Sequence, residues 1–89
     1  MVRMKVLEIQ NIQREEGAIY YLRKFRGDAV LELPMGNLKA PVSFSIETSP
    51  FGEKTIDVSL VKPLDYPVVP VKNALRTFIL AEDEQGKLP

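Results

Sequence analysis

Cysteine and histidine are both absent from this chain of 89 residues, and their absence removes whole classes of site. Nucleophilic arrangements of the Ser-His-Asp or Cys-His type cannot be built without them. Zinc and other soft or borderline metal ions would also lose their usual ligands. We therefore expect a protein that is not an enzyme and that holds neither a metal nor a cofactor.

Long apolar runs and an excess of charge of one sign are lacking as well. No stretch approaches the roughly 18 apolar residues that a membrane-spanning helix needs, and residues 1–5 lack the apolar core of a secretory signal. The 12 basic residues are matched by 12 acidic ones, so no overall field attracts a polyanion. These absences predict a cytoplasmic protein with no membrane partner.

The length and composition predict one small folded domain over residues 1–89. Hydrophobic residues make up 45% of the chain and charged residues 27%, which is typical of a globular protein rather than a disordered tail. A domain of this size buries about 60% of the surface that the unfolded chain exposes. Its stability is therefore expected to be modest.

A strict alternation of apolar and polar residues in two neighbouring segments is the clearest structural signal. Apolar side chains stand at positions 42, 44 and 46 and again at 56, 58 and 60, with polar residues between them. A period of two places the apolar side chains on one face of a strand and the polar ones on the other. The segments therefore predict an antiparallel pair with one buried and one solvated face. Because residues 42–48 carry almost no charge, we expect them inside the sheet rather than at an exposed edge.

Charge selects the register of this pair. Pairing Ile46 with Val58 would set Glu47 against Asp57, and like charges directly opposite one another destabilise a sheet. Pairing Ile46 with Ile56 avoids this contact and leaves a five-residue loop, which is a common length for a hairpin. We therefore predict the Ile46–Ile56 register.

Other segments rich in β-forming residues predict further strands. Within residues 2–10 the apolar positions slip by one at Val6 and Leu7, which indicates either a β-bulge or a shorter strand. The dipeptide Gly27-Asp28 is typical of a tight hairpin turn. Strands are therefore expected at residues 2–10, 18–26 and 28–33, with turns at 13–17 and 27–28 and a loop at 34–41.

A helix is predicted near the C-terminus, after a proline-rich crossing. Three prolines between residues 62 and 70 exclude a central strand and indicate an extended segment. Apolar residues at 71, 74, 75, 78 and 79 follow the spacing of one helical face, and Gly86 is a favourable stop. The crossing is thus expected over residues 62–70 and the helix over about 70–84.

Together these elements predict a mainly β, α+β fold. About five antiparallel strands should form a curled sheet or a partly open small barrel, with one C-terminal helix packed on it. One core should join the sheet to the helix. Its expected members are Phe44, Ile46, Ile56, Val58, Leu60, Leu75, Phe78 and Ile79.

The segment 20–26 combines aromatic and basic side chains. Rings can stack on bases and cations can contact phosphates, which is what the binding of single-stranded nucleic acid requires. Tyr21, Arg23 and Phe25 should share one face of the strand, and the alternate residues should share the other. The structural alternative is that one aromatic set lies in the core while the cations extend into solvent. The candidate binding residues are Tyr20, Tyr21, Arg23, Lys24, Phe25 and Arg26.

Small polar side chains predict a second candidate surface on the solvated face of the alternating pair. Serine is a poor strand former, so its repeated use there favours a reason beyond solvation. Small side chains would allow another sheet or chain to approach closely, and the alternative is an ordinary solvent face. The candidate interface residues are Ser43, Ser45, Thr55, Asp57 and Ser59.

The acidic run 82–84 lies at the C-terminal end of the expected helix, where the helix dipole disfavours negative charge. Such an end can fray into a solvated terminus, or its acids can meet a basic partner or an arginine of the same chain. Catalytic carboxylates are a further reading, but neighbouring positions of a helix do not face one another.

The sequence as a whole favours a non-enzymatic protein-interaction or structural module. A protein partner is expected, or self-association as a homodimer. The alternative function is weak binding of single-stranded nucleic acid through residues 20–26, and affinity would then fall steeply with salt.

Overall fold

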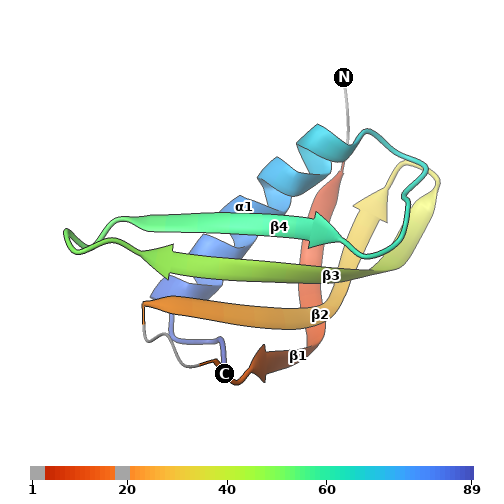
Figure 1. The fold of residues 1–89 in the computed structure, drawn as a ribbon. Coiled ribbons are helices and arrows are strands. Elements are labelled where there is room, and N and C mark those ends of the chain that lie inside the picture. The colour runs from red at the N-terminus through yellow and green to blue at the C-terminus, as the bar shows by residue number, and fades with distance from the viewer. Residues whose placement is uncertain (1–3, 18–20) are drawn as a thin grey trace.

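Four strands and one helix make up the fold, which a computed structural model describes over residues 4–17 and 21–89 (Figure 1). Each strand pairs antiparallel with the next along the chain, so the order across the sheet is β1-β2-β3-β4. The predicted mainly β, α+β fold is confirmed, but the sheet has four strands rather than five. The elements are β1 (Lys5–Glu15), β2 (Leu22–Leu33), β3 (Gly36–Thr48), β4 (Lys54–Leu60) and α1 (Val68–Glu84).

The turn predicted at Gly27-Asp28 is wrong, because β2 runs through both residues without a break. Gly27 lies opposite an irregular part of β1, where the register shifts between Gln10 and Gln13. A Cβ atom at position 27 would lie 2.8 Å from Cγ2 of Ile9 and 3.1 Å from the carbonyl oxygen of Gln10. The glycine therefore allows two strands to approach closely, which is a common use of glycine inside a strand. The two strands expected at 18–26 and 28–33 are consequently one.

The bulge predicted near the start of the chain is confirmed. The register of β1 on β2 shifts between Val6 and Glu8, which makes Leu7 the extra residue. β1 then continues to Glu15, so the turn expected at 13–17 begins later than predicted. Residues 18–20, the first part of the strand expected at 18–26, lie outside the described residues.

The loop predicted at 34–41 is also wrong, because β3 begins at Gly36 and only Pro34 and Met35 form the turn. Pro41 is paired with Asp28 of β2. Within the described residues, the pairing of β3 with β4 starts one residue later, so Pro41 lies where β3 borders a single strand. A proline is tolerated at such a position because no second neighbour needs its missing N–H group.

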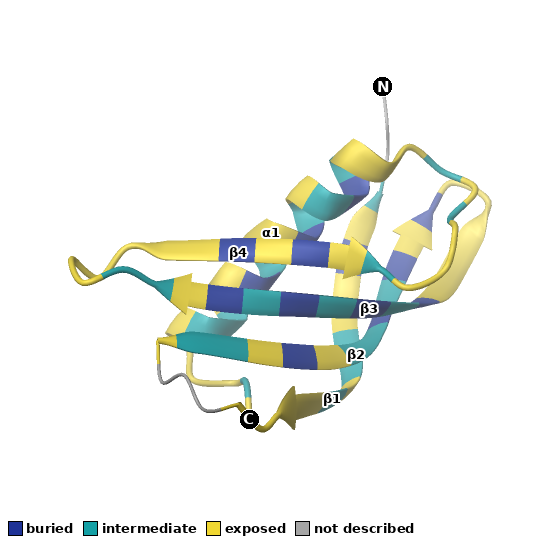
Figure 2. Ribbon diagram, viewed as in Figure 1, coloured by how far each residue is buried: buried dark blue, intermediate teal, exposed yellow. Residues whose placement is uncertain are grey.

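The predicted register of the β3–β4 hairpin is confirmed. Ile46 lies opposite Ile56 and Ser45 opposite Asp57, and residues 49–53 form the connecting loop. β3 lies inside the sheet between β2 and β4, as its lack of charge predicted. Buried residues alternate with more exposed ones along both strands (Figure 2).

α1 begins at Val68, earlier than the predicted start at about residue 70, and ends at Glu84 as predicted. Pro70 lies in its first turn, where backbone N–H groups have no partner inside the helix, so the proline costs little there. Beyond the end of the helix, the N–H group of Gly86 donates to the carbonyl oxygen of Asp83. In the described residues, no helix is both long and apolar enough to cross a bilayer.

One apolar core joins the sheet to α1, which contacts both edge strands, β1 and β4 (Figure 1). The sheet is curled and does not close, and the helix covers its concave side. The expected core residues belong to this core, although Leu60 and Phe78 are only partly buried. Its buried members are Val6, Phe25, Ala29, Leu31, Leu33, Ala40, Val42, Phe44, Ile46, Ile56, Val58, Val71, Leu75 and Ile79.

Candidate functional site

The five candidate interface residues lie together on the outer face of the sheet, the face turned away from α1. They all occupy positions that alternate with the buried residues of β3 and β4. Ser43 lies opposite Ser59 and Ser45 lies opposite Asp57, while Thr55 lies opposite Glu47. We call this surface, made of Ser43, Ser45, Thr55, Asp57 and Ser59, the hydroxyl face.

The strand β2 divides the candidate nucleic-acid residues between its two faces. Lys24 and Arg26 lie on the outer face, opposite Ser45 and Ser43. Phe25 points the other way, is 1% exposed and stacks on Phe44 with 5.0 Å between the ring centroids. Its ring is therefore part of the core, as in the structural alternative that the sequence left open. Tyr20 lies outside the described residues.

Tyr21 does not share a face with Phe25 as the sequence predicted. It precedes the first residue of β2 and lines the same surface depression as Glu47 and Thr55, which belong to the outer face. The alternation rule fails here because it applies only inside a regular strand. Tyr21 thereby joins the hydroxyl face at the end where the β3–β4 hairpin begins.

Arg23 lies on the inner face of β2 and forms the centre of an ion-pair cluster with α1. Its guanidinium donates two hydrogen bonds to the carboxylate of Asp83, at 2.8 and 3.0 Å. The ammonium of Lys54 donates to the same carboxylate at 2.7 Å. The side chain of Asp83 is only 8% exposed, so the cluster ties β2, β4 and the end of α1 together with little access to water.

The charges in this cluster set the protonation of Asp83. Hydrogen bonds from Arg23 lower the pKa of the Asp83 carboxyl to about 2, against the opposing effect of burial and with help from Lys54. The same contact raises the pKa of Arg23. Of the outcomes considered for the acidic run 82–84, an arginine of the same chain is therefore the one that applies to Asp83.

The remaining cation of this segment, Arg26, is paired across the sheet. Its Nε atom lies 3.4 Å from a carboxylate oxygen of Glu15 on β1, and both side chains are largely exposed. An exposed pair of this kind contributes about 0–1 kcal/mol. The outer face thus carries compensated charge rather than a basic stripe.

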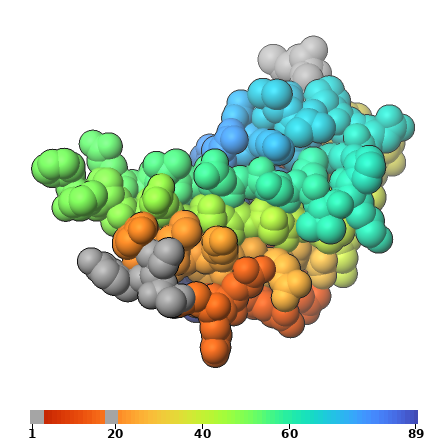
Figure 3. Space-filling model, viewed as in Figure 1, coloured from red at the N-terminus to blue at the C-terminus, as the bar shows by residue number. Residues whose placement is uncertain are grey.

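The loop of the β3–β4 hairpin projects beyond the rest of the molecule (Figure 3). The hydroxyl oxygen of Ser49 accepts hydrogen bonds from the N–H groups of Phe51 and Glu53, at 3.2 and 3.1 Å. Backbone bonds from the Ser49 N–H to the Glu53 carbonyl and from the Gly52 N–H to the Ser49 carbonyl close the loop. Gly52 has φ +86°, which favours glycine. These bonds hold Phe51 in place with its side chain 91% exposed.

Sequence reasoning missed Phe51 as a functional residue. The segment 49–53 has the right length for a hairpin connector and the composition of an ordinary turn. The available signal is a large apolar residue inside a turn, where polar residues are usual. Only the structure shows that no other described element covers Phe51.

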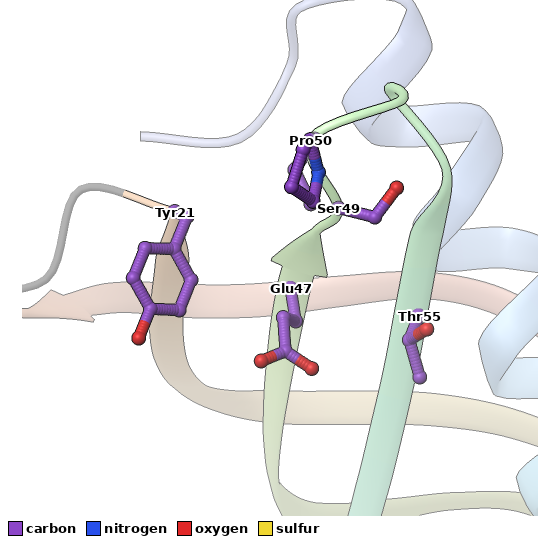
Figure 4. A pocket seen from close by; sticks show the side chains of 6 residues that line it. Tyr21, Glu47, Ser49, Pro50 and Thr55 are labelled. Atoms are coloured by element: carbon purple, nitrogen blue, oxygen red, sulfur yellow. The ribbon is translucent and has the colours of Figure 1, made fainter.

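A groove of about 710 Å³ lies between the hairpin and the start of β2 (Figure 4). The Tyr21 ring and the Glu47 carboxylate stand next to each other on one side of it, and Pro50 closes the end near the loop. Among the ion pairs of residues 4–17 and 21–89, none involves Glu47. The groove is lined by Tyr21, Glu47, Thr48, Ser49, Pro50 and Thr55.

Comparison with known proteins places the chain in a family and gives it no characterised relative. No curated protein matches the sequence. No solved structure matches it either. A family model matches residues 1–84, which is most of the chain, and the chain therefore belongs to the BB-0187 family.

Proposed function

We propose that this chain is a non-enzymatic protein-interaction module. Its contact surface is the hydroxyl face together with the projecting end of the β3–β4 hairpin. The observation that carries the proposal is Phe51, a large apolar side chain that is 91% exposed at the tip of a hydrogen-bonded loop. Full burial of a phenylalanine contributes roughly 1.5–3 kcal/mol, and nothing in the described chain uses this contribution.

The hydrogen bonds of the loop support a binding role for Phe51. A flexible loop would lose conformational entropy on binding, whereas Ser49 already restrains the backbone on both sides of the ring. Aromatic residues are common among the few residues that dominate the affinity of protein interfaces. A preorganised aromatic tip therefore suits insertion into an apolar pocket of a partner.

The hydroxyl face supports the proposal through its shape. Serine and threonine side chains at Ser43, Ser45, Ser59 and Thr55 leave the backbone of the sheet close to its surface. A partner could therefore lie near β3 and β4 while its rim contacts the charged residues beside them. Polar groups at these positions keep the unbound face compatible with water.

The alternative proposal, weak binding of single-stranded nucleic acid, has less support. Phe25 is in the core and Arg23 is paired with Asp83, so neither is presented to a ligand. The alternative therefore depends on Tyr21, Lys24 and Arg26. A titration with short single-stranded oligonucleotides, at low and then moderate salt, tests it through amide shifts at these residues.

The protein-interaction proposal is tested by replacing Phe51 with alanine. Wild-type chain and variant are expressed with an affinity tag in the cells of origin, cross-linked, captured and compared by quantitative mass spectrometry. Met35→Ala is the matched control, because Met35 is 73% exposed and lies in the turn between β2 and β3. We expect at least one cross-linked protein to be depleted about fivefold or more by Phe51→Ala and not by Met35→Ala.

Equal recovery of every cross-linked protein by the two variants would contradict the proposal. Both variants must first show the unfolding midpoint of the wild type, which we expect because surface substitutions usually change stability by less than about 0.5 kcal/mol. Recovery of the chain itself as the depleted protein would identify the partner as a second copy.

A further inference from the structure

The groove beside the hairpin combines an aromatic ring, a carboxylate and a proline on one open surface. Figure 4 shows the Tyr21 ring and the Glu47 side chain projecting in the same direction, with Pro50 next to them. We propose that this groove binds an arginine side chain of the protein partner. The inference rests on the proposed interaction function and assigns the chemistry of one contact.

Charge is the first argument for a cationic occupant. The ion pairs among the described residues leave Glu47 without a cation, although Glu47 is on the exposed face of β3. Its cross-strand neighbours are Leu22 and Thr55, and neither carries charge. An arginine from a partner would supply the missing opposite charge and could bind the carboxylate through two N–H groups.

The ring and the proline distinguish arginine from a simple cation. A guanidinium is planar and weakly hydrated, so it can stack on an aromatic ring while it donates to a carboxylate. Tyr21 supplies the ring beside Glu47, and Pro50 supplies an apolar surface for the aliphatic stem. A compact lysine ammonium would use the carboxylate but gain less from the flat ring.

The position of the groove links it to Phe51. Ser49 and Pro50 line the groove and directly precede Phe51, so one partner surface can reach both. We therefore expect the partner to present an apolar pocket for Phe51 with an arginine at its edge. This arrangement of a buried aromatic anchor and a charged rim is common at protein interfaces.

Two peptides that differ only in charge test the inference on the purified full-length chain. The probes are N-acetylated, C-amidated Ala-Arg-Ala-Arg-Ala and the same peptide with citrulline in place of both arginines. Citrulline keeps the shape of arginine and removes its charge. In an amide-resolved NMR titration we expect the arginine peptide to shift Tyr21, Glu47, Thr48 and Thr55, and the citrulline peptide to bind about fivefold or more weakly.

Variants of the groove separate its two parts. We expect Glu47→Gln and Tyr21→Leu each to weaken the arginine peptide by about two- to fivefold. Glu53→Gln, an exposed carboxylate of the same hairpin outside the groove, is the matched control and should leave affinity unchanged. Equal binding of the citrulline peptide, or unchanged affinity of Glu47→Gln, would overturn the inference.

The two proposals fail in different ways. Partner capture that depends on Phe51, combined with no binding of the arginine peptide, would refute the arginine site and retain the interaction module. Binding of the peptide that depends on Glu47, without capture that depends on Phe51, would support the arginine site and refute the hairpin as the main anchor.

Discussion

At the scale of single residues, Asp83 shows how a charge that is unfavourable locally becomes favourable in the folded chain. A carboxylate in the last turn of a helix is opposed by the helix dipole. Two cations from β2 and β4 reverse this balance, because Arg23 binds the carboxylate through two hydrogen bonds and Lys54 through a third. Asp83 therefore has a structural role that fastens the end of α1 to the sheet.

Replacing Asp83 with asparagine should lower the free energy of unfolding by roughly 1–2 kcal/mol at pH 7, as measured by urea denaturation. The folded-state pKa of Asp83 is about 2, below its ordinary value of 3.8. A lowered pKa stabilises the fold in full above about pH 5, and this contribution is lost as the pH falls through about 2. The stability difference between wild type and variant should therefore narrow steadily below pH 5.

The control for this prediction is Glu84→Gln, which removes a neighbouring carboxylate that is exposed. Its effect on stability at pH 7 should be within about 0.5 kcal/mol. A stability difference between Asp83→Asn and the wild type that stays constant from pH 7 to about pH 2.5 would contradict the assignment of the pKa shift.

At the scale of elements, the continuity of β2 depends on the shape of β1. A glycine next to an aspartate inside a β-rich segment has two structural meanings, a hairpin turn or a close approach within a sheet. The sequence around Gly27 does not distinguish them, because the atoms that decide are on another strand. Ile9 and Gln10 of β1 occupy the space that a side chain at position 27 would need.

Substituting alanine for Gly27 should destabilise the fold by about 1–3 kcal/mol, because the new methyl group has to displace a β-branched side chain and a backbone carbonyl. The opposing gain from restricting the unfolded chain is about 0.4–1 kcal/mol and is smaller. Thermal unfolding followed by circular dichroism measures the difference. Gly17→Ala is the control, since a Cβ atom there meets nothing within 4 Å. A Gly27→Ala variant as stable as Gly17→Ala would show that the strands separate freely at this point.

At the scale of the whole molecule, the balance of charge decides between classes of partner. The chain has 12 basic and 12 acidic residues, and the cations nearest the candidate surface are partly neutralised by Glu15 and Asp83. A protein that binds nucleic acid usually presents an uncompensated basic patch. The interaction module needs no such patch, because its anchor is an apolar side chain.

The chain should therefore elute from a heparin column at or below about 0.15 M salt. The double variant Glu15→Gln, Asp57→Asn removes two acids from the outer face and leaves Lys24 and Arg26 uncompensated, so it should elute later. Retention of the wild-type chain at clearly higher salt would favour the nucleic-acid alternative over the interaction module.

The placement of the candidate surfaces could be predicted only in part. The hydroxyl face followed from the period of two along β3 and β4, which a sequence displays directly. The groove did not, because Tyr21 and Glu47 are separated by a whole strand and a turn and meet only when β2 and β3 pair. Phe51 was missed because exposure is a property of the folded surface and not of a residue type.

The sequence by itself determined the elements whose signals are local. The register of Ile46 on Ile56, the bulge at Leu7 and the end of α1 all follow from periodicity, charge or a terminating glycine among neighbouring residues. Only the tertiary structure decided that β2 passes through Gly27 and that Asp83 binds Arg23. In both cases the deciding atoms belong to segments distant along the chain, and no pattern within one segment records which distant atoms will surround it.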